Sequence, residues 1–259
     1  MSDDRPSAPA LQLCHIHLRP RGPLESLDLA IRAARDWWRP LLTLSAVWLI
    51  PWWVACVALL GASHGSPWAL VAPIAVGPLV QAPFTVLGGR LLFAENVTIR
   101  SVFADLATRL GPWAGALGLQ ALAASFCLPL APLIQIPLVF VGECALLERV
   151  PFARAFRRSY RLTSGYAGGA VVGAFGRWGL LAWCAIVAES GMMGLTAIFQ
   201  VNLPIPAATD GVGTPWLVAG ILVSQPIWAL WRLLLYVDVR TRVEGWDLQV
   251  GFRAAGLAR

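Results

Sequence analysis

Arg177 and Glu143 are the residues with the clearest potential for chemistry, because each places a charge inside a long apolar run. In a helix that begins near Gly165, Arg177 lies about 18 Å along the axis. An Arg near the centre of a bilayer costs about 2.5–3.5 kcal/mol to insert and usually marks a functional site. If the helix instead begins near Ala170, the side chain extends to the headgroups. We expect Glu143 and Arg177 to form an intramembrane ion pair, which is either structural or part of a polar path.

Glycines at four-residue spacing precede Arg177. Gly165, Gly169 and Gly173 fall with Arg177 close to one face of a helix. Gly169 and Gly173 form a GxxxG motif, which lets a neighbouring helix approach closely. We therefore expect a helix-packing face that directs Arg177 towards protein rather than lipid.

Residue patterns typical of catalysis are missing from the sequence. It contains three His and no Lys, and it shows no HExxH, GxSxG or P-loop motif. Cys14, His15 and His17 form a short cluster, but their spacing matches no standard zinc site. We expect no catalytic, metal or cofactor site, and we interpret the chain as a protein other than an enzyme.

The amino-acid composition of the chain predicts a membrane protein. Hydrophobic residues make up 58% of the 259 residues and charged residues 13%. A soluble globule of this size could not bury so much apolar surface, and a disordered chain needs more charge. The net charge of +6 comes from Arg residues that flank the apolar runs, so we expect no nucleic-acid partner.

Six apolar runs are long enough to predict transmembrane helices, so the fold class expected is an all-α integral membrane protein. The run from 110 to 142 is too long for one span, and Pro129, Pro132 and Pro137 divide it into a hairpin. We expect a flexible tail (1–23), a membrane domain (24–243) and a C-terminal segment (244–259). The predicted spans are 40–61, 67–89, 113–130, 133–147, 165–189 and 215–237.

The Arg residues predict the orientation. With six spans, every Arg except Arg177 lies on the side that holds both termini, with Arg232 counted on that side. The loops near His64 and Pro132 and the 189–214 segment contain no Arg. The positive-inside rule therefore predicts cytoplasmic termini. Abundant Arg, Ala, Gly and Pro indicate a bacterial source, and hence the inner membrane.

Each pair of spans follows a short amphipathic segment, which predicts three copies of one unit. Apolar residues recur at three- and four-residue spacing on one face of each segment, with Arg elsewhere. Such helices should rest in the cytoplasmic interface against anionic headgroups. The expected apolar faces are Leu27, Ile31, Ala34 and Trp38; Ile99, Val102, Phe103, Leu106 and Leu110; and Phe152, Phe156 and Tyr160.

The C-terminal stretch is dense in charge where it leaves the membrane. Gly245 can end its helix. With Tyr236 and Trp246 at headgroup level the stretch is an interfacial anchor; alternatively it is a docking site for a cytoplasmic protein. The candidate docking residues are Asp238, Arg240, Arg242, Glu244, Trp246 and Asp247.

Three stretches resemble a group of polytopic bacterial inner-membrane proteins: 19–30, 155–162 and 235–248. These proteins are similar to the membrane domain attached to some glycerophosphodiester phosphodiesterases. In that family a separate soluble barrel domain carries the hydrolytic activity, and we expect no such domain in this chain. The resemblance implies a non-catalytic role in a larger envelope assembly.

Two functions remain open from the sequence. The first is an inner-membrane scaffold or accessory subunit, which binds other membrane or cytoplasmic proteins through its Arg-rich helices. The second is a transporter of small molecules or lipids, which would use a polar path near Glu143 and Arg177.

Overall fold

The computed structural model describes residues 22–64, 66, 70–92, 97–126, 131–199 and 214–245. All regular structure in these ranges is helical, and four helical segments are long and apolar enough to cross a membrane. The chain is an all-α membrane protein. The four segments are α2 (Trp38–Ala62), α3 with α4 (Val71–Ala75 and Gly77–Leu91), α10 (Ala167–Phe199) and α11 (Pro215–Glu244).

Shorter helices fill the expected third and fourth spans. The helix α6 (Leu110–Phe126) replaces the predicted span 113–130, of which 127–130 lie outside the described residues. The fourth segment is broken into α7 (Ala131–Gln135), a 3₁₀ turn (Ile136–Leu138) and α8 (Val141–Leu147). Pro137 lies in the 3₁₀ turn, where its missing N–H prevents a continuous α-helix.

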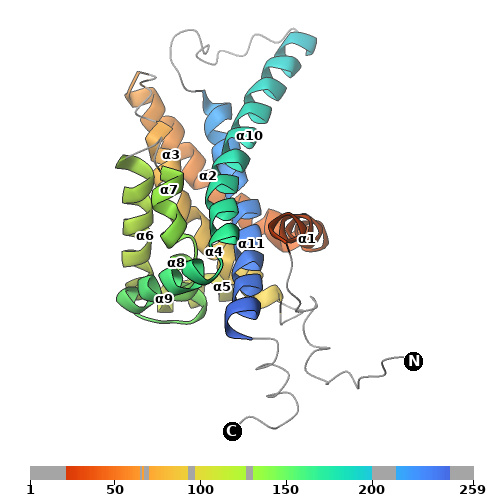
Figure 1. Cartoon of the computed structure of the whole chain (residues 1–259). Coiled ribbons are helices and arrows are strands. Elements are labelled where there is room, and N and C mark those ends of the chain that lie inside the picture. Colours follow the sequence, from red (N-terminus) through yellow and green to blue (C-terminus); the bar gives the residue numbers. More distant parts are fainter. Residues whose placement is uncertain are drawn as a thin grey trace, which may run out of the picture.

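The helix α11 lies at the centre of the bundle. It packs against α10, α4 and α2 (Figure 1). In the apolar stretch of α11, 78% of the residues are buried. In the corresponding stretches of α2 and α10, the buried shares are 22% and 33%. We therefore assign the outer surfaces of α2 and α10 to contact with lipid or with other proteins.

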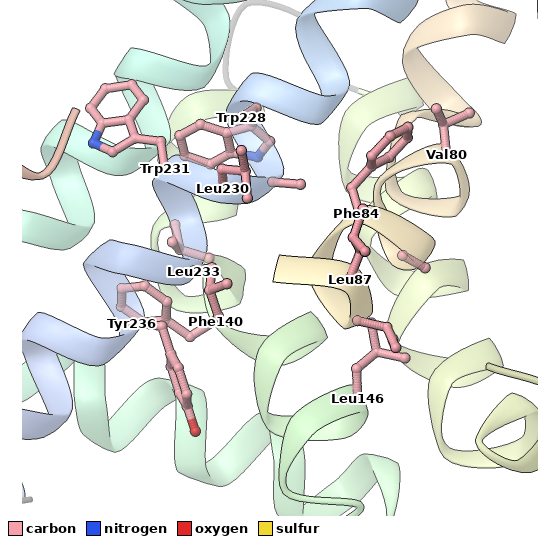
Figure 2. Close-up of a cluster of buried hydrophobic side chains, with 14 of the residues drawn as sticks. Val80, Phe84, Leu87, Phe140, Leu146, Trp228, Leu230, Trp231, Leu233 and Tyr236 are labelled. Carbon is pink, nitrogen blue, oxygen red and sulfur yellow. The ribbon is translucent and has the colours of Figure 1, made fainter. Parts of the chain in front are cut away.

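Large apolar side chains fill the core around α11. Figure 2 shows Phe84 and Leu87 of α4 together with Trp228 and Leu233 of α11. Phe140, in the turn before α8, stacks at a tilt on Tyr236, with ring centroids 5.9 Å apart. The broken fourth segment is thus packed as tightly into the core as the continuous helices.

The three predicted amphipathic segments are helices: α1 (Pro23–Asp36), α5 (Ile99–Thr108) and α9 (Phe152–Gly165). In α5 the expected apolar face is the buried one, through Val102 and Leu106. In α1 and α9 the most buried residues lie outside the expected apolar faces, although Leu27, Ala34 and Phe152 of those faces also pack against the core. In α1, Ser26, Ala30 and Ala33 are buried and the helix packs against α11.

In α9 the buried face likewise carries smaller side chains. Ala155 and Ser159 are buried, whereas Phe156 and Tyr160 are exposed. The apolar stripes are predicted to lie in the membrane interface, and the exposure of Phe156 and Tyr160 does not contradict that prediction. Close packing between helices favours small residues, so the bulky apolar side chains of the expected face point away from the bundle.

Two long helices extend beyond the expected spans. The helix α10 continues past Glu189 to Phe199. The helix α11 continues past residue 237 to Glu244 and ends as expected at Gly245, whose φ of 58° is left-handed. Residues 1–21 and 246–259, which include most of the expected tail and C-terminal segment, lie outside the described residues.

The expected glycine face is only partly used. Gly165 is the last residue of α9, not part of α10, and a Cβ on Gly169 would meet Tyr166 rather than a neighbouring helix. Gly173 lies against Leu235 of α11, where a Cβ would be in ordinary contact at 3.4 Å. The closest approach is made instead by Gly220 of α11, which lies against the backbone of α10.

Replacing Gly220 with Ala should destabilise the bundle by about 1–3 kcal/mol, because overpacking forces the backbones apart. A Cβ there would lie 2.4 Å from the Cys184 carbonyl oxygen and 2.7 Å from the Ala185 Cα. Thermal unfolding in detergent measures the effect. Gly179→Ala in α10 is the control, because nothing lies within 4 Å of its Cβ position and Ala favours a helix. Equal stability of the two variants would contradict the close approach.

Candidate functional site

Buried polar side chains gather in the middle of the bundle, and we call this set the polar centre. Its members come from α4, α6, α7, α8, α10 and α11, and all are buried. Polar groups in such a site need partners, because an unpaired buried group costs free energy. The polar centre consists of Gln81, Gln120, Gln135, Glu143, Arg177, Gln225 and Arg232.

Glu143 pairs with Arg232, not with Arg177 as expected. The Arg232 Nε donates to the Glu143 Oε1 at 2.5 Å. The two side chains are 4% and 0% exposed, so the ion pair is fully enclosed. Gly142 makes room for it, since a Cβ there would lie 3.2 Å from the Arg232 Nη2. The pair joins α8 to α11.

Arg177 is buried, with a relative exposure of 7%. The helix α10 begins at Ala167, which places Arg177 about 15 Å along it. The side chain therefore does not extend to the headgroups. Its Nη1 donates to the Gln135 Oε1 at 3.1 Å, while its Nε and Nη2 have no hydrogen-bond partner.

Amide side chains make the other links of the polar centre. The Gln81 Nε2 donates to the Gln225 Oε1 at 2.5 Å, which joins α4 to α11. The Gln120 Nε2 donates to the Leu138 carbonyl at 3.0 Å. Leu138 lies where the fourth segment is broken, so Gln120 of α6 satisfies one of the carbonyls in the interrupted stretch.

A small cavity lies within the polar centre. Its volume is about 10 Å³, which is close to the minimum needed for one water molecule. The polar side chains around it are Gln120, Gln135, Arg177 and Arg232, with the indole of Trp228. The remaining lining residues are Leu138, Val139 and Ala174.

A charge network lies at the Arg-rich end of the bundle. Arg158 of α9 forms ion pairs with Glu148 and, at 2.9 Å, with Glu244 of α11. The Tyr236 hydroxyl donates to Glu148, and Arg240 pairs with Glu244 at 3.0 Å. Burial lowers the pKa of Arg158, but the hydrogen bond and charge of Glu148 and the charge of Glu244 raise it above its ordinary value overall.

The same network contains most of the predicted docking residues. Besides Arg240 and Glu244, Asp238 pairs with Arg242 at 3.0 Å, and the Arg242 guanidinium lies 4.9 Å from the ring centroid of Tyr166. Their charges are therefore engaged within the chain, where they hold α9 and the end of α11 together. The other two predicted residues, Trp246 and Asp247, lie outside the described residues.

A second group of charges surrounds Asp105 of α5. Arg90 and Arg109 pair with it at 2.5 and 3.1 Å, and Arg109 also donates to the Leu146 carbonyl. Burial lowers the pKa of Arg109, and the Asp105 charge partly offsets this effect. The contacts tie α4, α5 and α8 together.

Arg232 is the charged member of the polar centre that the sequence patterns did not single out. Arg232 lies inside the predicted span 215–237, yet it was counted with the cytoplasmic Arg residues. The position of Arg232 inside an apolar run could have identified it as a buried charge, as it did for Glu143. Among the described residues no group of three His, Cys, Asp or Glu could hold a metal ion, and the cluster of Cys14, His15 and His17 lies outside them.

Replacing Glu143 with Gln should destabilise the protein by about 3–5 kcal/mol, because it leaves the buried Arg232 without its counter-charge. Unfolding in detergent measures the loss. The double variant Glu143→Leu/Arg232→Met should recover much of it, because the desolvation cost disappears with both charges.

The control is Asp28→Asn in the exposed pair with Arg32 at 2.8 Å, where the expected cost is below about 1 kcal/mol. A loss in Glu143→Gln as small as that of the control would contradict the buried ion pair.

Comparisons with family models, with curated proteins and with solved structures find no match for this chain. The polar centre, the charge network and the exposed apolar surfaces are therefore the observations on which a function can rest.

Proposed function

We propose that the chain is a non-catalytic scaffold or accessory subunit of an assembly in the inner membrane of a bacterial cell envelope. It crosses the membrane six times and keeps both termini in the cytoplasm. The observation that carries this proposal is the end of α10, which extends apolar surface beyond the length that a bilayer can cover.

Helix length shows the excess. The helix α10 starts at Ala167, directly after α9. From there to Glu189 it advances about 33 Å, whereas the hydrocarbon core of a bilayer is about 30 Å thick. The helix nevertheless continues to Phe199. We call residues 190–199 the α10 extension.

The α10 extension is apolar and uncovered by the described part of the chain. Met193, Leu195, Ile198 and Phe199 are between 50% and 74% exposed. Figure 1 shows this end of α10 leaning away from the helices α2, α3 and α6. Apolar helix surface outside the hydrocarbon core is stabilised by burial against protein, so a partner chain on the non-cytoplasmic side is the expected occupant.

The polar centre also supports a structural role. Its ion pair and amide hydrogen bonds join helices to one another, and the cavity between them has a volume of only about 10 Å³. An open pathway for a lipid or an organic solute would need a far larger cavity.

A six-span arrangement agrees with the described helices. Each of α1, α5 and α9 precedes a pair of apolar segments, and the pairs are α2 with α3–α4, α6 with α7–α8, and α10 with α11. The helix α6 alone is about 26 Å long, which nearly matches the bilayer core. This order of elements supports the proposal of three units, each with an interfacial helix followed by two spans.

Transport is the second candidate function. The observation that favours it is Arg177, which is buried and keeps two donors without partners beside the cavity. In a transporter this residue would bind substrate when the bundle opens. Loss of substrate movement in Arg177→Leu, with partner binding intact, would favour transport over the scaffold.

Replacing large apolar side chains of the α10 extension with Ala should release the partner without unfolding the chain. In the variant Met193→Ala/Ile198→Ala/Phe199→Ala, we expect at least a tenfold loss of the protein that co-purifies with the tagged chain from native membranes. The control is Ile50→Ala/Val54→Ala/Leu59→Ala on the exposed face of α2. Equal retention of the partner in both variants would contradict docking at α10.

Cysteine labelling tests the six spans. In a chain whose sole cysteine is Cys127, an impermeant maleimide should label intact spheroplasts, because a crossing by α6, which ends at Phe126, brings the next residue to the outer side. A chain whose sole cysteine comes from Ser164→Cys should be labelled only after lysis. Protection of Cys127 in intact cells, with labelling after lysis, would contradict the crossing by α6.

A further inference from the structure

The charges of the polar centre do not balance. Arg177 and Arg232 bring two positive charges, and Glu143 brings one negative charge, which is paired with Arg232. Arg177 has only the neutral Gln135 as a hydrogen-bonded partner. In the described part of α10 the nearest acidic residue is Glu189, about 18 Å along the helix, where it accepts a hydrogen bond from Thr214. A net positive charge therefore remains enclosed in an apolar bundle.

In the residues that line the cavity, the buried side-chain atoms without a hydrogen-bond partner are all donors. They are the Arg177 Nε and Nη2, the Gln135 Nε2 and the Trp228 Nε1. The unpaired acceptors of the polar centre belong to Gln81 and Glu143, which do not line the cavity. A cavity with this lining selects a ligand that accepts hydrogen bonds and carries negative charge.

We propose that the polar centre binds one small monovalent anion, of the size of chloride, between Arg177, Gln135 and Trp228. The cavity of about 10 Å³ is close to the size of one water molecule, so the side chains around it must move slightly outward to admit chloride, and the cavity excludes a phosphate or a lipid headgroup. Water in the same place would accept some of the hydrogen bonds but would leave the charge of Arg177 uncompensated.

The anion would act as a structural ligand. Its contacts come from α7, α10 and α11. Among the described residues, no ion pair joins these three elements around the cavity. Bound there, it neutralises Arg177 and removes the repulsion between Arg177 and Arg232 from an apolar environment. The folded bundle should therefore be more stable when the anion is present.

Halide-dependent unfolding tests this site. At constant ionic strength, replacing gluconate with chloride should raise the Tm of the purified protein in detergent by a few degrees for each tenfold increase above the Kd. The variant Arg177→Gln should lose this dependence. Arg154→Gln in α9 removes an equal charge from an exposed position and should keep it.

Equilibrium dialysis of the wild-type chain with radioactive chloride gives a second measurement that needs no variant. One saturable site per chain supports the proposal, and so does its loss in Arg177→Gln where that variant folds. No saturable binding, or the same chloride dependence of Tm in Arg177→Gln as in wild type, would overturn it and leave water in the cavity. Both experiments use the isolated chain, so their failure is distinct from failure to recover a partner.

Discussion

The enclosed pair between Glu143 and Arg232 is the interaction on which the rest of the bundle depends. Neither charge can be left alone in an apolar interior, because desolvation would cost several kcal/mol. The pair therefore fixes α8 against α11, the helix around which α10, α4, α1 and α2 pack. It brings a short helix from the broken fourth segment into the core, where Phe140 and Leu146 contribute to the packing (Figure 2).

Placing a broken segment in the core requires partners for its backbone, and the neighbouring helices provide them. Gln120 of α6 donates to the Leu138 carbonyl. Ser159 of α9 donates to the Pro137 carbonyl at 2.8 Å and accepts from the Phe140 N–H at 3.3 Å. This is the physical reason that α9 turns its small polar face inward and leaves Phe156 and Tyr160 outward. The polar centre and the orientation of the interfacial helix thus follow from the same interruption at Pro137.

Helix positions could be predicted from the sequence because they depend on local patterns. Apolar runs located α2 and the beginnings of α10 and α11 to within two residues, and the three amphipathic segments are helices, but α10 and α11 end ten and seven residues beyond the predicted spans. The partner of Glu143 could not be predicted in this way, because Arg177 and Arg232 both interrupt apolar runs and only the tertiary arrangement of the helices selects between them. The faces by which α1 and α9 contact the bundle could not be predicted for a related reason, since hydrophobicity does not distinguish contact with lipid from contact with protein.

The two ends of the bundle present different chemistry, and this asymmetry supports a scaffold. At the Arg-rich end the charges of Glu148, Arg158 and Glu244 satisfy one another, while Arg154, Arg157 and Arg161 remain exposed beside the outward stripe of α9. Exposed Arg next to aromatic residues suits anionic headgroups, which would anchor this end to the membrane surface in the proposed arrangement. The opposite end offers the α10 extension, which has little charge to interact with headgroups. A partner protein that buries apolar helix surface is the ligand that suits such an end, and a chain anchored by lipid at one end is well placed to hold it.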